Sequence, residues 1–478
     1  MFLHAHYACK EKRMFTGRIN EIERLNGFYE GDECGVAVVS GSYGVGKTTL
    51  LRHFSEDKTN IYIEAYETTG KHQCQLIGGK LGLEPGATAT DICEKITELA
   101  TVEKQLVIID QYPNIVKGDA EFDKVLYEYV TGVWHKLPIK LVLCSDAFVL
   151  IDKYVKGKKA KWKDTIQLDL VVEPFGFYDS LSFFSDASPA DAAFLYGITG
   201  GIAYNLVRAK QIYESAQSDN KTKEVAQKLF MDKDSAVGIN PEKVMATELR
   251  ELAYYNYMLT TLAKGISRVN QISAEVDKPK DVVVPYLNSL MAIGVCTKET
   301  AITELNNRKK TRYSIINTST LFWYRFIVPN FDLYAAGKVD ELWDKVEEDI
   351  DDYMKQVFIS MCSEYLENRS EDNQLPFTVE ETGNWWVNDD EAGTTDGFDL
   401  VALGKSDGKS ATIFCQCFYN HSEIEVAQLK ALIEKTKQLK RQGDVFYLVF
   451  SKSGFNENAI TISSAIKNIM LITLDEMR

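Results

Sequence analysis

The sequence predicts an α/β protein whose first part is a doubly wound parallel sheet, followed by a helical region and a second α/β region. Two observations support this expectation. Short apolar runs alternate with helical stretches through about residue 175, and the strand and helix patterns resume in a mixed order after about residue 345. A chain of 478 residues with 45% hydrophobic residues can form about three domains, each with its own core.

Five buried strands are expected in the first part. Their apolar, largely β-branched runs are "GVAVVS", "NIYIEA", "KQLVIID", "IKLVLCS" and "TIQLDL". Stretches such as "TDICEKITELA" and "DAEFDKVLYEYV" between them have helical periodicity. The alternation predicts a five-stranded parallel sheet with helices on both faces, so the carboxyl ends of its strands meet at one edge.

The segment after the first strand matches the pattern G-x-x-x-x-G-K-[ST] and opens a helix with "TTLLRHF". Glycines let the backbone N–H groups approach phosphate oxygens, and the helix N-terminus adds a positive partial charge. Lys47 would reach the terminal phosphates, and the Thr48 hydroxyl would bind Mg²⁺. The segment therefore predicts a P-loop NTPase core, with nucleotide-binding residues Gly41, Ser42, Tyr43, Gly44, Val45, Gly46, Lys47, Thr48 and Thr49.

Three further residues at strand ends complete the predicted site. Asp110 ends "KQLVIID", where its carboxylate would be the second Mg²⁺ ligand, and Ser145 ends "KLVLCS", where it would point toward the γ-phosphate. Gln111 follows Asp110 where most nucleotide hydrolases have Glu. An amide cannot accept a proton from water as a carboxylate does, so we expect slow hydrolysis; the alternative is that Gln111 orients the water, as a glutamine does in some GTPases.

Bulk composition limits the classes of partner. A formal net charge of −15 argues against generic binding to a phosphate backbone and leaves only a local basic patch for DNA. Three further features favour a cytoplasmic protein without membrane contact. The nine Cys include no C-x-x-C pair, the chain opens without a signal segment, and no apolar run approaches the ~20 residues of a membrane span.

The middle of the chain predicts a winged helix. A helix is followed by Gly265, a short helix, the break "DKPK", a third helix and then two strands joined by "NNRKKTR". The third helix should bury Val284, Leu287, Leu290 and Met291.

Two interpretations of the predicted winged helix remain open. The exposed face of its third helix carries Lys280, Asp281 and Asn288. This face lacks the basic character expected of a helix that contacts DNA bases. The wing has a cationic cluster of Arg308, Lys309, Lys310 and Arg312. It is either a DNA contact or, as is more common for a charged loop tip, a solvated surface on a packing module.

Five segments together resemble the archaeal-type ATPases of the STAND/AAA+ P-loop group. They are "MFTGRINEIERL", the glycine loop, "VIIDQYP", "LYGITGGIAYNL" and "YSIINTSTLFWYRFIVPN". The resemblance implies Mg-ATP as ligand and places Phe15, Gly17 and Arg18 beside the base and ribose. It also implies four domains: an ATPase core (1–175), a helical lid (176–240), a winged helix (241–330) and a restriction-endonuclease-like domain (331–478).

The chain departs from the pattern of these ATPases near the phosphates and in the lid. Gln111 replaces Glu, and Ala203 stands where the family usually has Pro. The segment "KGKKAKWKDTI" before the fifth strand has only lysines where similar ATPases carry Arg, so Lys161 or Lys163 would be a weaker substitute. Asp119 and Glu121 are other acids that could replace the missing carboxylate, although their spacing does not recommend them.

The carboxyl-terminal domain departs further. The nuclease fold it resembles cuts DNA with an Asp and a Glu-x-Lys on neighbouring strands. Here Asp399 is retained, but Gln416, Cys417 and Phe418 occupy the Glu-x-Lys positions, and a helical Phe-Glu becomes Phe358 and Ile359. Cys415 and Cys417 share one face of a strand as small core residues.

Because one carboxylate is a poor Mg²⁺ site, we expect a non-cleaving domain that docks an unidentified protein partner. The expected function is a slow ATP-dependent switch. The alternatives are an ATP-regulated nuclease whose acids come from other positions, and a DNA-binding regulator that acts through the wing.

Overall fold

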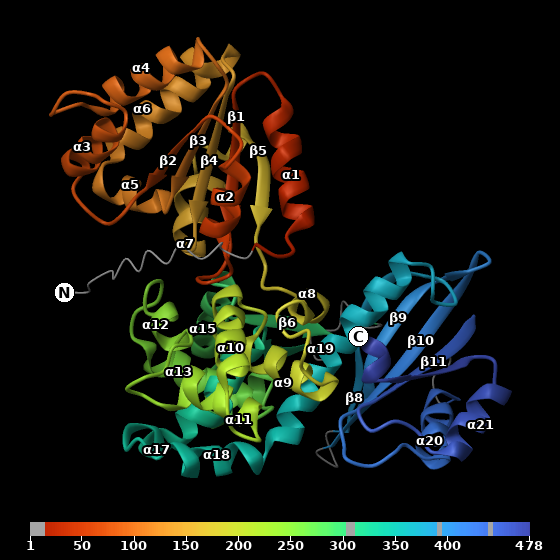
Figure 1. Ribbon diagram of the computed structural model, residues 1–478. Coiled ribbons are helices and arrows are strands. Elements are labelled where there is room, and N and C mark those ends of the chain that lie inside the picture. Colours follow the sequence, from red (N-terminus) through yellow and green to blue (C-terminus); the bar gives the residue numbers. More distant parts are fainter. Residues whose placement is uncertain (1–14, 303–310, 390–393, 438–442) are drawn as a thin grey trace. The chain divides into compact units, whose positions relative to one another are not determined.

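The computed structural model describes residues 15–302, 311–389, 394–437 and 443–478, and it divides into two compact units, residues 1–173 and 174–478 (Figure 1). The further division of the second unit into a lid, a winged helix and a carboxyl-terminal domain stays a prediction. In the described ranges, no helix is both long and apolar enough to cross a bilayer.

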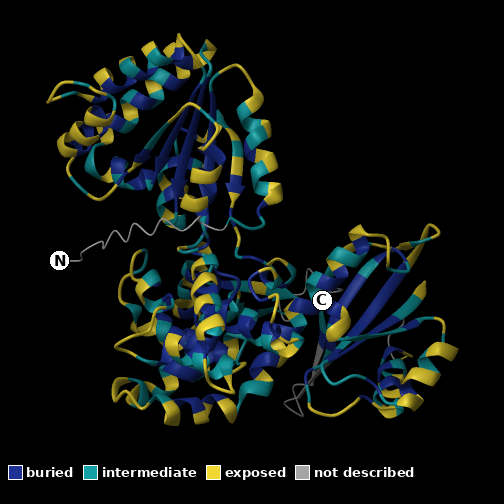
Figure 2. Ribbon diagram, viewed as in Figure 1, coloured by how far each residue is buried: buried dark blue, intermediate teal, exposed yellow. Residues whose placement is uncertain are grey.

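The first unit contains one sheet in the order β2-β3-β4-β1-β5, and every pair of neighbouring strands is parallel. This confirms the predicted five-stranded parallel sheet. Every residue of β1, β3 and β4 is buried, because helices cover both faces of the sheet (Figure 2). The strands are β1 Gly35–Ser40, β2 Asn60–Glu64, β3 Gln105–Asp110, β4 Ile139–Ser145 and β5 Ile166–Val171.

Successive residues of each strand point to opposite faces of this sheet and build two separate cores. Leu106 and Ile108 pack with the side chains of α1 and α2, whereas Val107 and Ile109 pack with those of α3 to α6. The helices are α1 Ile19–Glu30, α2 Lys47–Ser55, α3 Gly70–Lys80, α4 Ala89–Ala100, α5 Tyr112–Gly118, α6 Ala120–Thr131 and α7 Phe148–Ile151. Short 3₁₀ or π turns cover Val133–Lys136, Asp152–Lys156 and Lys163–Thr165.

The second unit begins with helices. These are α8 Phe177–Leu181, α9 Pro189–Thr199, α10 Ala203–Ser215, α11 Lys221–Ala226, α12 Pro241–Met245, α13 Leu252–Ala263, α14 Val269–Glu275 and α15 Lys280–Ala292. A π turn, Gln227–Met231, extends α11. The hairpin of β6 Cys296–Thr300 and β7 Thr311–Ile315 follows α15. Arg308, Lys309 and Lys310 of the predicted wing lie outside the described residues.

One position of the predicted core of α15 is wrong. Val283 is fully buried, together with Leu287 and Leu290, and the partly buried Met291 packs against the same core, whereas Val284 is only half-buried. The helix begins at Lys280, and its inner face therefore follows the spacing 283, 287 and 290.

The remaining helices of the second unit lead into a mixed sheet. Helices α16 Thr318–Phe322, α17 Phe331–Ala335, α18 Val339–Glu347 and α19 Ile350–Glu371 precede it, with turns at Trp323–Ile327 and Val328–Asn330. The sheet has the order β12-β11-β10-β9-β8, antiparallel from β8 to β10 and parallel from β10 to β12.

Its strands are β8 Thr378–Asp389, β9 Thr394–Ser406, β10 Lys409–Phe418, β11 Asp444–Ser451 and β12 Ile469–Thr473, with α20 Val426–Lys437, α21 Glu457–Ala465 and a last turn Asp475–Met477. One of the two apolar cores of the second unit runs from α9 through α19 to β10. Cys362 of α19 meets Cys415 and Cys417 of β10 in this core, where all three thiols are fully buried.

Candidate functional site

The loop between β1 and α2 has a backbone that only glycine adopts easily. Gly44 and Gly46 have φ angles of +83° and +101°, in the left-handed region. A Cβ atom on Gly41 would lie 2.4 Å from the carbonyl oxygen of Val172, so no side chain fits there. The glycines of the predicted pattern therefore let the loop fold back tightly onto the first turn of α2.

Lys47 is the first residue of α2, and its buried ammonium group lies inside this loop. Its Nζ donates hydrogen bonds to the carbonyl oxygens of Gly41 and Ser42, both at 2.9 Å. An ammonium group has three N–H donors, and these two bonds use two of them. The side chain that the sequence predicts to contact phosphate is thus held over the loop by the loop's own backbone.

Thr48 and Asp110, the two predicted Mg²⁺ ligands, are in direct contact. Thr48 Oγ1 donates to Asp110 Oδ2 at 2.7 Å, and the hydroxyl of Tyr62 donates to the same oxygen at 2.9 Å. Burial, followed by the negative charge of Asp110, raises the pKa of Tyr62, so this phenol stays protonated as a donor. Sequence reasoning missed Tyr62, because its role depends on the pairing of β2 with β3.

The other carboxylate oxygen of Asp110 fits a cation. Oδ1 is buried, and within the described part of the chain it accepts no hydrogen bond from an N–H or O–H group. The nearby Cys144 thiol stays neutral, because burial and the Asp110 charge raise its pKa well above 9.0. A buried carboxylate oxygen without a strong donor is costly, and Mg²⁺ prefers such oxygens together with a hydroxyl and phosphate groups. Thr48 and Asp110 are therefore a suitable ligand pair for Mg²⁺.

Two serines end neighbouring strands at the same edge of the sheet. Ser145 of β4 is in register with Ser40 of β1, and the Ser145 hydroxyl oxygen accepts a hydrogen bond from the backbone N–H of Ala147 at 3.0 Å. Ser40 Oγ is buried, and no described residue gives it a hydrogen-bond partner. Sequence reasoning missed Ser40, although its signal was a small polar residue that ends a buried strand directly before the glycines.

Gln111 lies between β3 and α5 in a strained backbone conformation. Its φ of +60° places a residue with a Cβ atom in the left-handed region, which costs about 1–2 kcal/mol relative to the right-handed one. Its carbonyl oxygen accepts a hydrogen bond from Asn114 N at 2.9 Å, which closes the turn into α5. Gln111 is half-buried at the strand edge next to Asp110, and its role toward water stays a prediction.

Phe15 and Thr49, two of the predicted nucleotide contacts, line one cavity of about 340 Å³ together with His53, Glu56 and other residues. The Phe15 ring is stacked on the His53 ring of α2, with centroids 3.9 Å apart and planes inclined by 20°. Tyr43, at the tip of the glycine loop, is 53% exposed.

Gly17 and Arg18 form a left-handed turn before α1, with φ angles of +67° and +62°. The buried Arg18 guanidinium donates to the Val45 carbonyl oxygen at 2.9 Å and to Glu21 Oε1 at 2.8 Å. Arg18 thus braces the phosphate loop from the side of α1.

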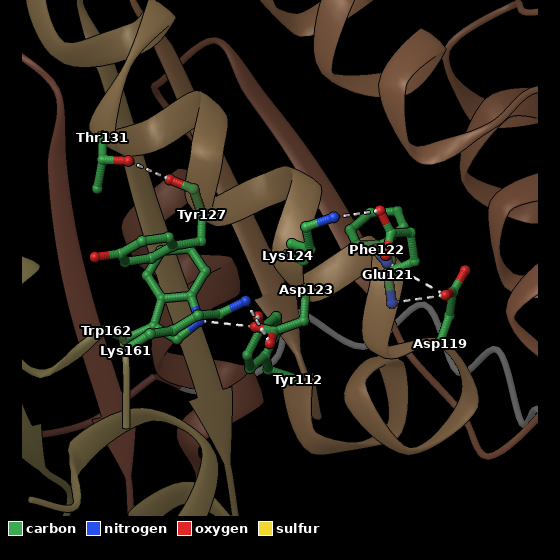
Figure 3. A network of polar contacts seen from close by, with 10 residues as sticks. All are labelled: Tyr112, Asp119, Glu121, Phe122, Asp123, Lys124, Tyr127, Thr131, Lys161 and Trp162. Atoms are coloured by element: carbon green, nitrogen blue, oxygen red, sulfur yellow. Dashed lines mark hydrogen bonds and ion pairs between the residues drawn. The ribbon is translucent and has the colours of Figure 1, made fainter. Parts of the chain in front are cut away.

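Lys161 forms an ion pair with a carboxylate of α6. Its Nζ lies 2.8 Å from Asp123 Oδ2, while Trp162 Nε1 donates to Asp123 Oδ1 at 2.8 Å and the Tyr112 hydroxyl donates to the same oxygen (Figure 3). The charge of Lys161 is paired with a largely buried carboxylate, so its substitution for Arg stays a prediction. Lys163, the other candidate, is exposed in the turn before β5.

Asp119 and Glu121 belong to the start of α6 (Figure 3). Asp119 Oδ1 accepts hydrogen bonds from the backbone N–H groups of Glu121 at 3.0 Å and Phe122 at 3.3 Å, which is a helix N-cap. Glu121 forms an exposed ion pair with Lys124. Asp119 therefore caps α6, and Glu121 pairs with Lys124 on the same helix.

Asp399 of β9 and Gln416 of β10 are neighbours in the second unit, as the sequence predicts. Asp399 Oδ2 accepts hydrogen bonds from Gln416 Nε2 and, at 2.8 Å, from the backbone N–H of Cys417. Lys355 Nζ of α19, which sequence reasoning missed, lies 3.9 Å from Oδ1. Burial raises the pKa of Asp399. In the described ranges, no three His, Cys, Asp or Glu side chains form a group that could hold a metal ion.

Arg312 of the hairpin packs against the sheet of the same unit. Its guanidinium carbon lies 4.3 Å from the centroid of the Trp386 ring in β8, and burial lowers its pKa. Ile302 N also donates to the Asn384 carbonyl oxygen at 3.0 Å. Arg312 is therefore not part of a solvated loop tip, because its guanidinium is half-buried against an aromatic ring, and a DNA contact through the wing stays a prediction.

Comparisons with known proteins agree with this architecture. Residues 323–431 match the family model DUF234, described as archaeal and bacterial proteins of unknown function. An uncharacterized protein of Methanocaldococcus jannaschii, MJECL04, is 25% identical over 398 residues, which cover 83% of this chain and 86% of the relative.

Solved structures with a similar fold include the Walker-type ATPase PABY2304 of Pyrococcus abyssi. It has a TM-score of 0.50 and 17% identity, with 65% of this chain and 96% of that chain covered. The ORC2 protein of Aeropyrum pernix in its ADPNP-ADP complexes has a TM-score of 0.49 and 16% identity, with 67% and 96% covered. The similarity to PABY2304, together with the order of the parallel sheet, shows that the first unit has the fold of Walker-type, P-loop ATPases.

Proposed function

We propose that this chain binds Mg-ATP in the loop between β1 and α2 and hydrolyses it slowly, so that the bound nucleotide acts as a switch. The observation that carries the proposal is the contact between Thr48 and Asp110, with one oxygen of Asp110 buried and without an N–H or O–H donor in the described chain. Gln111, which cannot act as a base, follows directly.

The residues of the loop would divide the work of binding. Backbone N–H groups between Gly44 and Thr48 would donate to phosphate oxygens, and Lys47 would use its remaining N–H or exchange its carbonyl partners for phosphate. Thr48 and Asp110 would hold Mg²⁺, which supplies charge neutralisation for the phosphates. The cavity lined by Phe15 and Thr49, at about 340 Å³, is large enough for part of a nucleoside.

Slow turnover follows from the residue after Asp110. A carboxylate base contributes typically about 10²–10⁴-fold to a rate, and the amide of Gln111 cannot take up the proton of an attacking water. A protein with this site would keep ATP bound long enough for other parts of the chain to respond to the bound nucleotide.

For the second unit, we propose a lid, a winged helix that packs within the chain, and a restriction-endonuclease-like domain that docks a protein partner in the cytoplasm without cutting DNA. The hydrogen bonds that Asp399 accepts from Gln416 and Cys417 support the absence of cleavage, because they occupy one of its two oxygens. The contact of Arg312 with Trp386 supports a packing role for the hairpin over the alternative of an ATP-regulated DNA-binding or nuclease protein.

The test is calorimetry of ATP and ADP, each with Mg²⁺, on the full chain and on Lys47→Ala, with Lys95→Ala of α4 as a matched control. Wild type and the control should bind adenine nucleotide equally. Loss of a charged hydrogen bond to phosphate should weaken binding to Lys47→Ala about 10- to 100-fold. Equal affinity of all three proteins would contradict the proposed site.

A further inference from the structure

Glu64, the last residue of β2, is the in-register partner of Asp110 in β3. Neighbouring strands lie about 4.8 Å apart, and paired residues of a parallel sheet point to the same face. The backbone just beyond is fixed as well, because Ala65 N donates to the Asp110 carbonyl oxygen at 2.9 Å. Glu64 therefore occupies a rigid position at the carboxyl edge of the sheet, one strand away from the predicted Mg²⁺ ligand.

The contacts of β2 show which face Glu64 shares. Tyr62, two residues earlier, points to the α2 side, where its hydroxyl reaches Asp110. Ile63 packs into the core on the opposite face. Arg52 of α2 forms an ion pair with the Glu64 carboxylate, and its guanidinium carbon lies 4.7 Å from the centroid of the Tyr62 ring. The Glu64 carboxylate thus lies on the same side of the sheet as Thr48 and Asp110.

Glu64 differs from Asp119 and Asp123, two acids at the start of α6 whose carboxylates already have partners. Asp119 caps α6, and Asp123 accepts hydrogen bonds from Tyr112 and Trp162 and pairs with Lys161. The side chains of Glu64 and Arg52 are 52% and 43% exposed, and an ion pair between such accessible groups is weak. Glu64 can therefore exchange Arg52 for water at little cost.

We propose that Glu64 is the carboxylate that activates water in this site, in place of the Glu absent at position 111, and that its ion pair with Arg52 restrains it. This inference rests on the proposed function. Glu64 takes a proton from water as the water oxygen bonds to the γ-phosphorus. The bond from that phosphorus to the bridging oxygen breaks, and ADP leaves with the electron pair. Glu64 then returns its proton to solvent.

The experiment compares phosphate release, ATP affinity and the nucleotide retained after purification for the full chain and its variants. Glu64→Gln should release phosphate at least about tenfold more slowly than wild type, bind ATP within about threefold of the wild-type dissociation constant, and retain a larger fraction of ATP over ADP. Arg52→Gln, which frees Glu64, should release phosphate about two- to fivefold faster, the range expected for loss of a weak ion pair. Asp146→Asn, a carboxylate variant just beyond β4, is the matched control and should behave as wild type.

A second pair of variants separates the two carboxylate positions. With Gln111→Glu present, a base is available at the usual position, so adding Glu64→Gln should slow phosphate release less than twofold, in contrast to the wild-type background. Melting curves verify that each variant folds, and Glu64→Asp, which keeps the charge but shortens the reach, should lie between wild type and Glu64→Gln.

These measurements distinguish failure of the proposal for Glu64 from failure of the proposed function. No nucleotide binding by wild type would remove both proposals. Normal binding with undetectable hydrolysis by wild type would overturn the role of Glu64 and the slow hydrolysis, and would leave only the proposed Mg-ATP binding. Normal binding with unchanged hydrolysis by Glu64→Gln would overturn the role of Glu64 alone. Loss of hydrolysis in Asp146→Asn without loss in Glu64→Gln would assign the base to Asp146, just beyond β4, instead.

Discussion

Thr48 Oγ1 lies 2.7 Å from Asp110 Oδ2, although 62 positions separate the two residues in the chain. The contact exists because β3 runs parallel within the same sheet as β1, so both chain segments reach its carboxyl edge. It joins the hydroxyl at the start of α2 to the carboxylate at the end of β3, the two groups from which a Mg²⁺ site can be built.

Asp110→Asn should weaken nucleotide binding mainly in the presence of Mg²⁺. An amide supplies a neutral oxygen where Mg²⁺ prefers a carboxylate, so the metal-dependent gain in ATP affinity should fall about 10- to 100-fold. Titrations of ATP with Mg²⁺ and with EDTA measure this gain. An equal gain in wild type and Asp110→Asn would show that Asp110 does not hold the metal.

Gln111→Glu should raise the rate of ATP hydrolysis. The change supplies a carboxylate at the usual position of the base, and we expect an increase of about 10- to 100-fold, because the strained turn limits its alignment. Steady-state phosphate release measures the effect, with Gln111→Ala as the control that removes the amide without adding a base. A wild-type rate that is already fast, and that Gln111→Glu leaves unchanged, would contradict the slow-switch account.

The second unit should not cut DNA. Asp399 already accepts hydrogen bonds from Gln416 and Cys417, and one carboxylate is a poor site for a hard cation. Incubation of the full chain with plasmid in Mg²⁺ or Mn²⁺ should leave the plasmid intact. Cleavage that disappears in Asp399→Ala would assign nuclease activity to this domain.

The free energy of unfolding of the second unit should fall as pH rises through mildly acidic values, because of the Glu364 carboxyl group. Its carboxylate on α19 accepts hydrogen bonds from the N–H groups of Phe177 at 2.6 Å and Tyr178 at 3.1 Å, yet burial raises its pKa above the usual 4.5. Between these two pKa values the folded chain binds more protons than the unfolded chain, so the free energy of unfolding falls with increasing pH.

Melting temperatures between about pH 4 and 7 test this coupling, since that window spans the usual carboxyl pKa and its raised value. The pH dependence should be smaller in Glu364→Gln than in wild type, whereas Glu371→Gln, an exposed change on the same helix, should keep the wild-type profile. A profile of Glu364→Gln that parallels wild type would remove Glu364 as the cause.

The sequence predicted what depends on local pattern. The glycine loop, its strand and its helix are contiguous, and Asp110 is recognisable as the polar end of a buried strand. Contacts between distant segments could not be predicted from pattern alone. Tyr62 and Glu64 gain their roles from the register of β2 with β3, and Lys161 is paired with Asp123 of α6.

Two errors have simple physical causes. The apolar run of α15 contains several adjacent valines, and the pattern alone does not decide which of them faces the core. Val283 faces the core, whereas the sequence analysis expected Val284 there. The sequence placed Arg312 in a solvated cationic tip. In the folded unit its guanidinium packs against the ring of Trp386, and this contact could not be predicted because Trp386 lies 74 positions later in the chain.

Calorimetric titration of the purified full chain with ATP and Mg²⁺ tests the central claim most directly. The account predicts a saturable, Mg²⁺-dependent affinity for ATP that Lys47→Ala weakens at least about tenfold. No measurable heat of binding for ATP or ADP, with an equilibrium-dialysis measurement also negative, would contradict it.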